Sequence, residues 1–281
     1  MPIDSFMTMK NKLGELRLLI SRKYISEFSR QRKFRILFSK KDDWEPIIRK
    51  DFRYTRHRLT FDNFSLENIK NHDLIVPLDI DDIFYLNEVR TLIDGNPIPI
   101  PTAESARLCD DKYLFNKILI ENKFEKLIPR MGDDLKKPYI LKKRVDCWGV
   151  NSHIITDNKD EDKFSNEINS EEYFCQELIY GEKKYATHMI FSKGMAIHSI
   201  NIEYKYDTDI YIKGKNKWLY TKKVDCQYIK LFCSVLELIG FEGLCCINYK
   251  VSNHLPLLIE INPRFGGSLS SHFHSFMKHI A

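Results

Sequence analysis

The stretch "IEINPRFGGS", residues 259–268, follows directly on the apolar run "HLPLLI". If these residues form a strand, side chains alternate between its faces with a period of two, so Glu260 and Asn262 share one face. Arg264 continues that face, and the glycine pair after it allows backbone N–H groups to approach a ligand closely. The pattern alone leaves two interpretations open: a solvated edge strand that enters a surface turn, or a buried strand that carries ligands for a charged molecule.

The side chains on this face are suited to binding a metal ion and a phosphate, which supports the second interpretation. Two oxygen-donor side chains about 7 Å apart on one strand face suit a hard cation such as Mg²⁺, which prefers oxygen ligands and often bridges to substrate phosphates. Arg264 adds a planar donor suited to a phosphate or a carboxylate. The apolar opposite face and flanks favour an internal strand, which weakens the first interpretation without excluding it.

Two lysines elsewhere could serve the same site. Lys142 follows the strand-like residues of "KPYILKKR" (137–144), so its ammonium group could project from a sheet into a cleft. Lys112 follows an acidic pair at the start of a helical run. Taken singly, each is more often a solvated surface residue than a ligand.

Composition limits the class of protein. With 281 residues, 43% hydrophobic and 30% charged, the chain can bury a substantial core and is too apolar for a disordered protein. A net charge of +5 does not require a nucleic-acid partner, although the first sixty residues are the more basic part. The seven cysteines include no C-x-x-C pair, which favours reduced thiols and no zinc site. No signal peptide and no apolar run of about 18 residues is visible, so we expect a cytoplasmic protein without an integral membrane segment.

The hydrophobic pattern predicts mixed helices and strands. Residues 33–95 read as strand, helix, strand, typical of a small Rossmann-like unit, and the proline-rich "NPIPIPT" (96–102) is a candidate boundary. Antiparallel hairpins with helices between groups of strands indicate an α+β fold rather than a doubly wound sheet. The expected helices cover 7–33, 65–72, 79–93, a run after residue 102 with Asp110 and Asp111 at its N-terminal end, and about 222–239. The expected strands cover 33–40, 72–80, 137–144, 172–179, a hairpin over 185–206 that turns at Ser192–Gly194, and two final strands joined by "SNH".

In their order along the chain, these segments resemble a known superfamily. The series "SARLCDDKYLFNKIL", "IPR", "PYILKKR", "FCQELIYGE", "GLCCINYKV" and "LLIEINPRFGGS" is similar to the ATP-grasp ligases, and most similar to the carbamoyl-phosphate synthase and biotin carboxylase branch. The resemblance covers roughly residues 100–271. It implies an ATP-grasp domain over 101–281, with a small subdomain at about 130–180 and a large one at about 181–281. Residues 1–100 would hold N-terminal helices and a Rossmann-like pre-ATP-grasp domain.

The resemblance also implies roles in nucleotide binding. Lys112 and Lys142 match the lysines that touch the ATP phosphates, and Lys142 would also assist catalysis. Gln176 matches the residue that meets the adenine amino group, and the backbone at Glu177 and Ile179 would complete the adenine edge. Glu182 is a candidate contact to the ribose.

The resemblance implies further roles in binding the metal ion and the phosphorylated intermediate. Glu260 and Asn262 match Mg²⁺ ligands, and Arg264 matches the arginine that steadies the phosphorylated intermediate. Asn248 occupies a position where the superfamily usually supplies another metal-binding carboxylate. Two more departures are a loop after Lys142 with one glycine, and Lys184 where a glutamate usually precedes the tyrosine.

The implied activity is ATP-dependent joining of a carboxylate to an amine through an acylphosphate, with ATP and Mg²⁺, or Mn²⁺ in its place, as cofactors. The partners would be a small-molecule or glycan-linked carboxylate and an amine acceptor, not nucleic acid; a homodimer is left open. A degenerate domain that binds nucleotide without turnover is the alternative that the departures favour. A polyanion- or membrane-surface-binding protein that uses the basic N-terminal region is a third. The candidates for a general base are His188, His198, His272 and His274.

Overall fold

The computed structural model describes residues 33–93, 99–147, 149–277 and 279. The helices expected over 7–33 therefore lie outside the described residues, apart from position 33. The chain divides into two compact units. The first contains the residues up to Leu78 and those that follow from Val89 to Pro97, and the second contains Asp79–Glu88 and Ile98–Ala281.

The first unit is built on a parallel three-stranded sheet in the order β2-β1-β3. Its strands are β1 (Arg35–Ser39), β2 (Arg58–Asp62) and β3 (Leu74–Val76), connected through α2 (Glu45–Asp51) and α3 (Leu66–Lys70), and a 3-10 turn spans Arg90–Leu92. The strands expected near 33–40 and 72–80 are confirmed, but the sequence did not reveal α2 and β2. Because β2 is a half-exposed edge strand, it lacks the continuous apolar signal of β1.

The second unit begins with helices. These are α4 (Ile80–Glu88), α5 (Ala103–Asp110) and α6 (Lys112–Glu121), and a 3-10 turn follows at Glu125–Leu127. The helix expected with Asp110 and Asp111 at its N-terminal end is confirmed as α6, but α5 before it was missed. The backbone of Asp111, between the two helices, is extended (φ −81°, ψ 94°). The Asp111 carboxylate accepts hydrogen bonds from the backbone N–H groups of Tyr113 and Leu114 and so caps α6. This cap makes Lys112 the first residue of the new helix.

A small antiparallel sheet follows, in the order β5-β4-β6. It consists of β4 (Tyr139–Lys143), β5 (His153–Ile155) and β6 (Tyr173–Glu177), and α7 (Asn158–Lys163) and α8 (Ser165–Ile168) lie between β5 and β6 in the chain. Tyr139, Leu141 and Ile155 form its buried core. The register pairs Ile140 with Gln176 and Lys142 with Phe174, so two candidate site residues lie on adjacent strands.

The large sheet has five antiparallel strands in the order β11-β10-β7-β8-β9. They are β7 (Lys183–Ser192), β8 (Met195–Lys205), β9 (Tyr220–Val224), β10 (Gly243–Ser252) and β11 (Leu255–Asn262). The two expected hairpins are confirmed. The first turns through Lys193 and Gly194, and the second through Asn253 and His254, all with positive φ.

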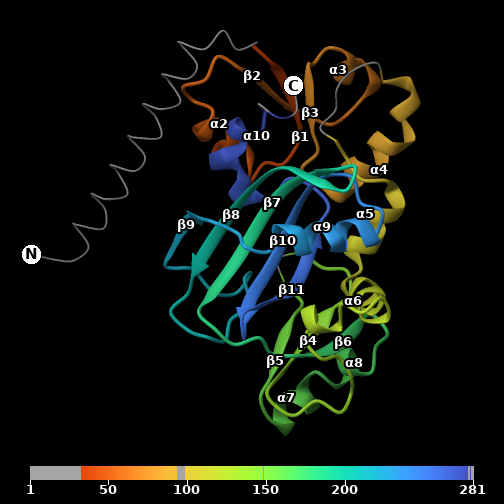
Figure 1. The fold of residues 1–281 in the computed structure, drawn as a ribbon, viewed down its shortest axis with the longest axis vertical. Coiled ribbons are helices and arrows are strands. Elements are labelled where there is room, and N and C mark those ends of the chain that lie inside the picture. Colours follow the sequence, from red (N-terminus) through yellow and green to blue (C-terminus); the bar gives the residue numbers. More distant parts are fainter. Residues whose placement is uncertain (1–32, 94–98, 148, 278, 280–281) are drawn as a thin grey trace, which may run out of the picture. The chain divides into compact units, whose positions relative to one another are not determined.

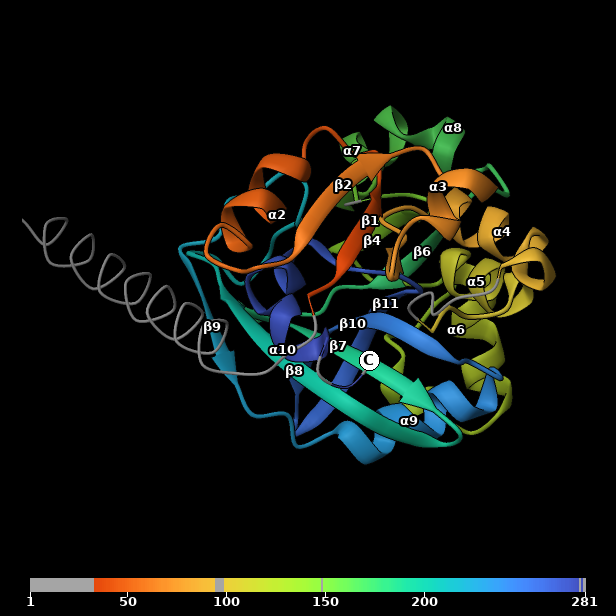
Figure 2. The same cartoon turned by 90° about the horizontal axis from the view of Figure 1, so that it is seen from above.

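Helices cover one face of this sheet. Figures 1 and 2 show α9 (Ile229–Leu238) lying across it, with α5 and α6 beside it. Phe232, Val235 and Leu236 of α9 share one core with inward-facing residues of β7, β10 and β11. The helix expected over 222–239 begins only at Ile229, because residues 220–224 pair with β8 as the edge strand β9. The chain continues through a 3-10 segment at Gly267–His272 into α10 (Phe273–Met277).

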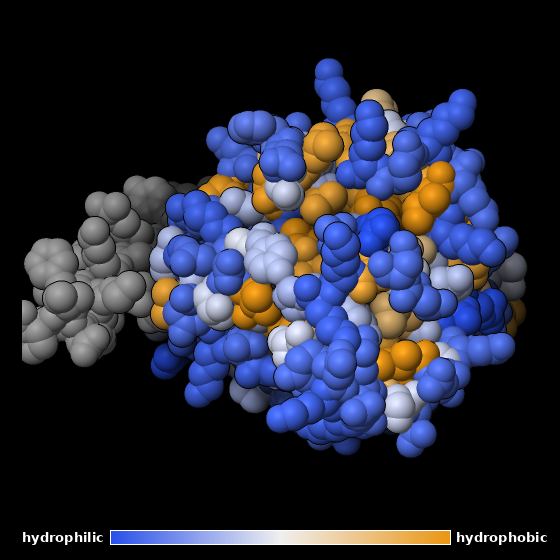
Figure 3. All heavy atoms as spheres, turned by 90° about the horizontal axis from the view of Figure 1, so that it is seen from below, coloured by the Kyte–Doolittle hydropathy of each residue, from blue (hydrophilic) through white to orange (hydrophobic). Residues whose placement is uncertain are grey.

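Hydrophilic side chains dominate the face of the molecule that is drawn in Figure 3, and the hydrophobic residues form separate groups between them. In the described part of the chain, no helix combines the length and the apolar character needed to cross a bilayer.

The start of β10 approaches the segment before α5 so closely that only glycine fits. An alanine Cβ at Gly243 would lie 2.2 Å from the Pro99 carbonyl oxygen, and the φ of this glycine is +104°. Gly240 also has positive φ (+59°), but a Cβ there would meet nothing within 4 Å. Gly240→Ala should cost about 1–2 kcal/mol through backbone strain alone. Gly243→Ala should cost roughly 2 kcal/mol more, because the hydrogen bond from Leu244 N to Pro99 O (2.9 Å) must also shift.

Urea unfolding of both variants, followed by circular dichroism, measures this difference. Equal losses of unfolding free energy in the two variants would contradict the close approach at Pro99.

Candidate functional site

The polar face of β11 holds a partly buried carboxylate, that of Glu260, whose side chain is 16% exposed. Glu260 lies opposite Asn248 of β10, and its Oε1 accepts hydrogen bonds from the side-chain amides of Asn248 and Asn262, each at 3.1 Å. Ile261 between them is buried in the core on the other face. Burial works to raise the pKa of Glu260, but the charges of surrounding lysines and the Asn262 hydrogen bond lower it to about 2. Glu260 is therefore ionised at neutral pH.

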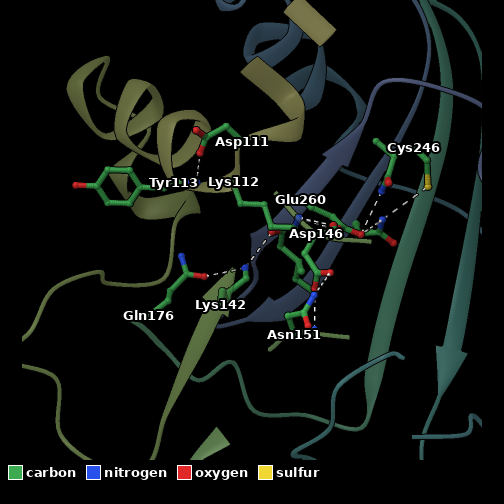
Figure 4. Close-up of polar contacts among 12 residues, drawn as sticks. Asp111, Lys112, Tyr113, Lys142, Asp146, Asn151, Gln176, Cys246 and Glu260 are labelled. Atoms are coloured by element: carbon green, nitrogen blue, oxygen red, sulfur yellow. Dashed lines mark hydrogen bonds and ion pairs between the residues drawn. The ribbon is translucent and has the colours of Figure 1, made fainter. Parts of the chain in front are cut away.

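Lys112 reaches this carboxylate from the start of α6. Its Nζ donates to the Asp146 carbonyl oxygen (2.7 Å) and lies 3.9 Å from Glu260 Oε2. Figure 4 shows Lys112, Lys142 and Glu260 converging from α6, β4 and β11. The aspartate cap explains this orientation, because Asp111 fixes where α6 begins and hence where Lys112 points.

Lys142 extends from the small sheet toward β11. Its Nζ donates to Gln176 Oε1 (3.1 Å) and to the Ile259 carbonyl oxygen (3.2 Å). Burial, aided by the charge of Lys112, lowers the pKa of Lys142 to about 8, although Glu260 opposes this shift. Lys142 therefore links the small sheet to the large one through a buried ammonium group.

The segment from Gln176 to Ile179 lies along the same pocket. Gln176 is buried, and its Nε2 donates to the Pro129 carbonyl oxygen (3.2 Å) while its Oε1 accepts from Lys142. The backbone N–H of Glu177 donates to Arg130 O (2.8 Å), and Ile179 O accepts from Lys250 Nζ (2.8 Å). These contacts hold the segment in place at one side of the pocket.

Two more buried lysines come from the large sheet. Lys184 of β7 donates to Asn248 Oδ1 (2.5 Å), and burial together with Lys213 lowers the pKa of Lys184 to about 7. Lys250 of β10 donates to Ile179 O and to Asp209 O, and its Nζ lies 3.9 Å from the Tyr211 ring centroid. Burial lowers the pKa of Lys250 to about 8.

Together these groups line one pocket. Its lining residues include five lysines and two glutamates: Lys112, Lys142, Lys184, Lys213, Lys250, Glu177 and Glu260. Four of the lysines are buried, with 3–7% of their surface exposed. Among them, Lys112 has a carboxylate within 4 Å, whereas Lys142, Lys184 and Lys250 hydrogen-bond to neutral oxygens. Burying cations against neutral acceptors is costly, and an anionic ligand would offset that cost.

Sequence reasoning missed part of this set. Lys184 was recognised as a departure, but Lys213 and Lys250 were not singled out. A usable signal for Lys250 exists, because Asn248 and Lys250 are two positions apart on β10 and therefore share a face. Lys213 lies between strands, in a segment without a periodic pattern, and only the fold brings it to the pocket.

Other predicted site residues lie elsewhere. The Glu182 side chain is 47% exposed and forms an ion pair with Lys205 outside the pocket lining. Arg264 is half-buried and is also outside the lining, although its charge acts on Asp110 and Cys246. Both assignments stay predictions.

The four candidate histidines are not among the pocket-lining residues either. His188 is buried, its Nε2 lies 2.7 Å from Ser268 Oγ, and burial lowers its pKa to about 3. A histidine this weakly basic is neutral at physiological pH and is poorly suited to act as a general base.

The donor set can be compared with the needs of a divalent cation. No cluster of three or more His, Cys, Asp or Glu side chains suited to a metal occurs among the described residues. Glu260 and the Asn262 amide fit one oxygen-liganded ion whose remaining ligands come from a bound phosphate. Asn248 fits less well. Since lysine can only donate and a carboxylate can only accept, Lys184 and Glu260 fix the amide orientation so that the Asn248 oxygen faces an ammonium group.

Comparison with known proteins identifies a family for this chain. A family model described as "ATP-grasp domain" matches residues 109–268, more than half of the chain. That range includes every pocket lysine. A search of curated proteins finds no match.

Solved structures share the fold at low sequence identity. D-alanine–D-alanine ligase from Bacillus anthracis matches with a TM-score of 0.58 and 13% identity, covering 87% of this chain and 92% of that one. Phosphoribosylamine–glycine ligase from Thermotoga maritima matches with a TM-score of 0.62 and 14% identity over 84% and 70% of the two chains. L-amino acid ligase from Bacillus licheniformis gives 0.60 and 13%, over 87% and 70%. The predicted α+β ATP-grasp fold is thereby confirmed.

The low pKa of Glu260 predicts a pH-dependent contribution to stability. An unfolded glutamate titrates near about 4.3, so the folded carboxylate contributes stability that is fully present above about pH 4.5 and is lost as the pH falls toward 2. Relative to the native chain, Glu260→Gln should lose on the order of 3 kcal/mol of unfolding free energy near neutral pH. The loss should shrink steadily at lower pH. Urea unfolding between about pH 7 and about pH 3 measures it.

Glu121→Gln, at the exposed end of α6, is the matched control. It should change the unfolding free energy by less than about 0.5 kcal/mol across the range. A loss in Glu260→Gln that does not vary with pH would show that the carboxylate is not held ionised by the lysines.

Proposed function

This chain belongs to the ATP-grasp family, and on that premise we propose that it is an ATP-dependent ligase that joins a carboxylate to an amine through an acylphosphate. The observation that carries the proposal is the set of buried lysines around Glu260, three of which face neutral oxygens. A nucleotide triphosphate supplies the negative charge that these ammonium groups lack.

The nucleotide would lie with its phosphates toward Lys112 and Lys142 and its adenine along the Gln176–Ile179 segment. Two observations support this orientation: both groups of residues line the pocket, and Lys112 lies beside Glu260. The backbone at Glu177 and Ile179 and the amide of Gln176 are the proposed adenine contacts. The ribose contact expected at Glu182 requires this carboxylate to leave Lys205.

The reaction proposed has two displacements. A carboxylate oxygen of the substrate attacks the γ-phosphorus of ATP, the bond to the β–γ bridging oxygen breaks, and ADP leaves. The amine nitrogen then attacks the acyl carbon of the acylphosphate, inorganic phosphate leaves with the bonding electrons, and the nitrogen loses a proton to give the amide. Both steps depend on alignment and charge compensation more than on covalent help from the protein.

The residues of this chain supply that compensation. Lys112 and Lys142 neutralise charge on the phosphates, and Arg264, beside Asp110 and Cys246, is the proposed contact to the phosphorylated intermediate. Mg²⁺ or Mn²⁺, held by Glu260 and Asn262, would offset charge on the phosphate oxygens when bound. The proposed partners are a small-molecule or glycan-linked carboxylate and an amine.

A second candidate function is a nucleotide-binding module without turnover. Asn248 bound to Lys184 favours it, because this contact removes a metal ligand that full activity could require. Incubation of the chain with ATP, Mg²⁺ and pools of carboxylates and amines separates the two. ADP formation that depends on both pools supports the ligase, whereas ATP binding without ADP formation with any pool supports the module.

Glu260→Ala should abolish ADP formation and Mg²⁺-dependent ATP binding, because it removes the pocket carboxylate that lies 3.9 Å from Lys112 Nζ. Glu121→Ala, at the exposed end of α6 and outside the pocket lining, is the matched control. ATP titration followed by calorimetry, with near-ultraviolet circular dichroism as a check of the fold, measures both. Unchanged binding in Glu260→Ala would contradict the site.

A further inference from the structure

A row of polar side chains crosses the large sheet on its pocket face. The strand registers align Glu260 of β11 with Asn248 of β10, and Asn248 with Ala186 of β7. Lys184 is two residues before Ala186 and therefore projects from the same face, opposite Tyr204 of β8. The row thus runs from a carboxylate through an amide to an ammonium group.

The hydrogen bonds along this row have a defined direction, because an ammonium group donates and a carboxylate accepts. Lys184 Nζ donates to Asn248 Oδ1, and Asn248 Nδ2 donates to Glu260 Oε1. The Asn248 amide therefore has both of its ends engaged between a cation and an anion. Lys184 is 3% exposed, and its Nζ also lies 5.3 Å from the Tyr204 ring centroid. The ammonium group of Lys184 thus lies between the Asn248 amide and the Tyr204 ring.

Several positive charges lie around the row. Lys112, Lys184 and Lys213 all act on Glu260, and Lys184 and Lys213 both line the pocket and repel each other. An anion bound near them would be attracted by both charges. The pocket thus holds positive charge at the place where the phosphate groups of a ligand would bind.

We propose that the Lys184 ammonium group is a built-in cation of the phosphate site. It takes the place of a metal ion that Glu260 and Asn248 would otherwise hold, so polyphosphates bind here without a metal ion at Asn248. This inference rests on the proposed function, because it assumes that the ligand is a nucleotide polyphosphate. In this proposal Asn248 positions the Lys184 ammonium group and does not bind a metal ion. The proposal therefore replaces the expectation that Asn248 is a metal ligand.

A binding experiment with inorganic tripolyphosphate tests the role of the charge. The native chain should bind this probe in EDTA as well as in Mg²⁺. Lys184→Gln keeps a donor toward Asn248 but removes the charge, and it should weaken binding in EDTA by about tenfold or more. Lys184→Arg should restore binding to within about threefold of the native value. Isothermal titration calorimetry gives the affinities, and thermal melting shows that each variant is folded.

A double variant tests the exchange of lysine for metal directly. Asn248→Asp combined with Lys184→Gln places a second carboxylate beside Glu260 and removes the ammonium group. Its binding of tripolyphosphate should be lost in EDTA and restored by Mg²⁺. The matched control is Lys183→Gln, since the Lys183 side chain is 49% exposed and pairs with Glu203 instead. The control should bind like the native chain.

The outcomes separate this inference from the proposed function. If the native chain binds ATP and tripolyphosphate in Mg²⁺ but not in EDTA, the built-in cation is wrong and the nucleotide site stands. Equal affinities of Lys184→Gln and the native chain in EDTA would likewise overturn it. If neither ligand binds in either condition, the proposed function fails and the inference fails with it.

Discussion

The burial of ammonium groups against neutral acceptors is the constraint on which the rest of the pocket depends. A buried lysine without a carboxylate partner destabilises the folded chain unless hydrogen bonds and a ligand compensate for its lost hydration. Here the backbone oxygens of Ile259 and Ile179 and the amides of Gln176 and Asn248 provide the hydrogen bonds. Those acceptors come from both sheets, so the two sheets must be assembled before the lysines can be held.

Glu260 is central to this arrangement because it balances several cations at once. Its carboxylate receives two amide hydrogen bonds and the field of three lysines, which outweigh the cost of its own burial. The large sheet gives it a rigid position, since β11 pairs with β10 along nearly its full length and packs its other face against α9. The apolar core on the opposite face of the sheet therefore determines where the polar residues of the pocket face lie.

Much of this could be predicted from the sequence, for definite physical reasons. The period-two alternation of "IEINPR" correctly predicts Glu260 and Asn262 on one face, and the turn residues correctly predict both hairpins of the large sheet. Helix α5 and the edge strand β9 were missed, because a short, largely polar helix and a strand exposed on most of its length leave little trace in hydrophobic periodicity. The gathering of Lys184, Lys213 and Lys250 depends on contacts between distant strands, which no local pattern contains.

The junction between β4 and α6 has a consequence for how the pocket can open. Arg144, just after β4, bonds the Asp111 carboxylate that caps α6, and its carbonyl oxygen accepts from the Lys112 backbone N–H. The body of α6 packs through Phe115 and Leu119 into the core of the large sheet. The end of β4 is thus attached to α6, and through α6 to the core of the large sheet. A movement of the two sheets that kept these bonds would be a rotation about this junction, which would displace β5 and the far end of β4 and leave Lys112 in place.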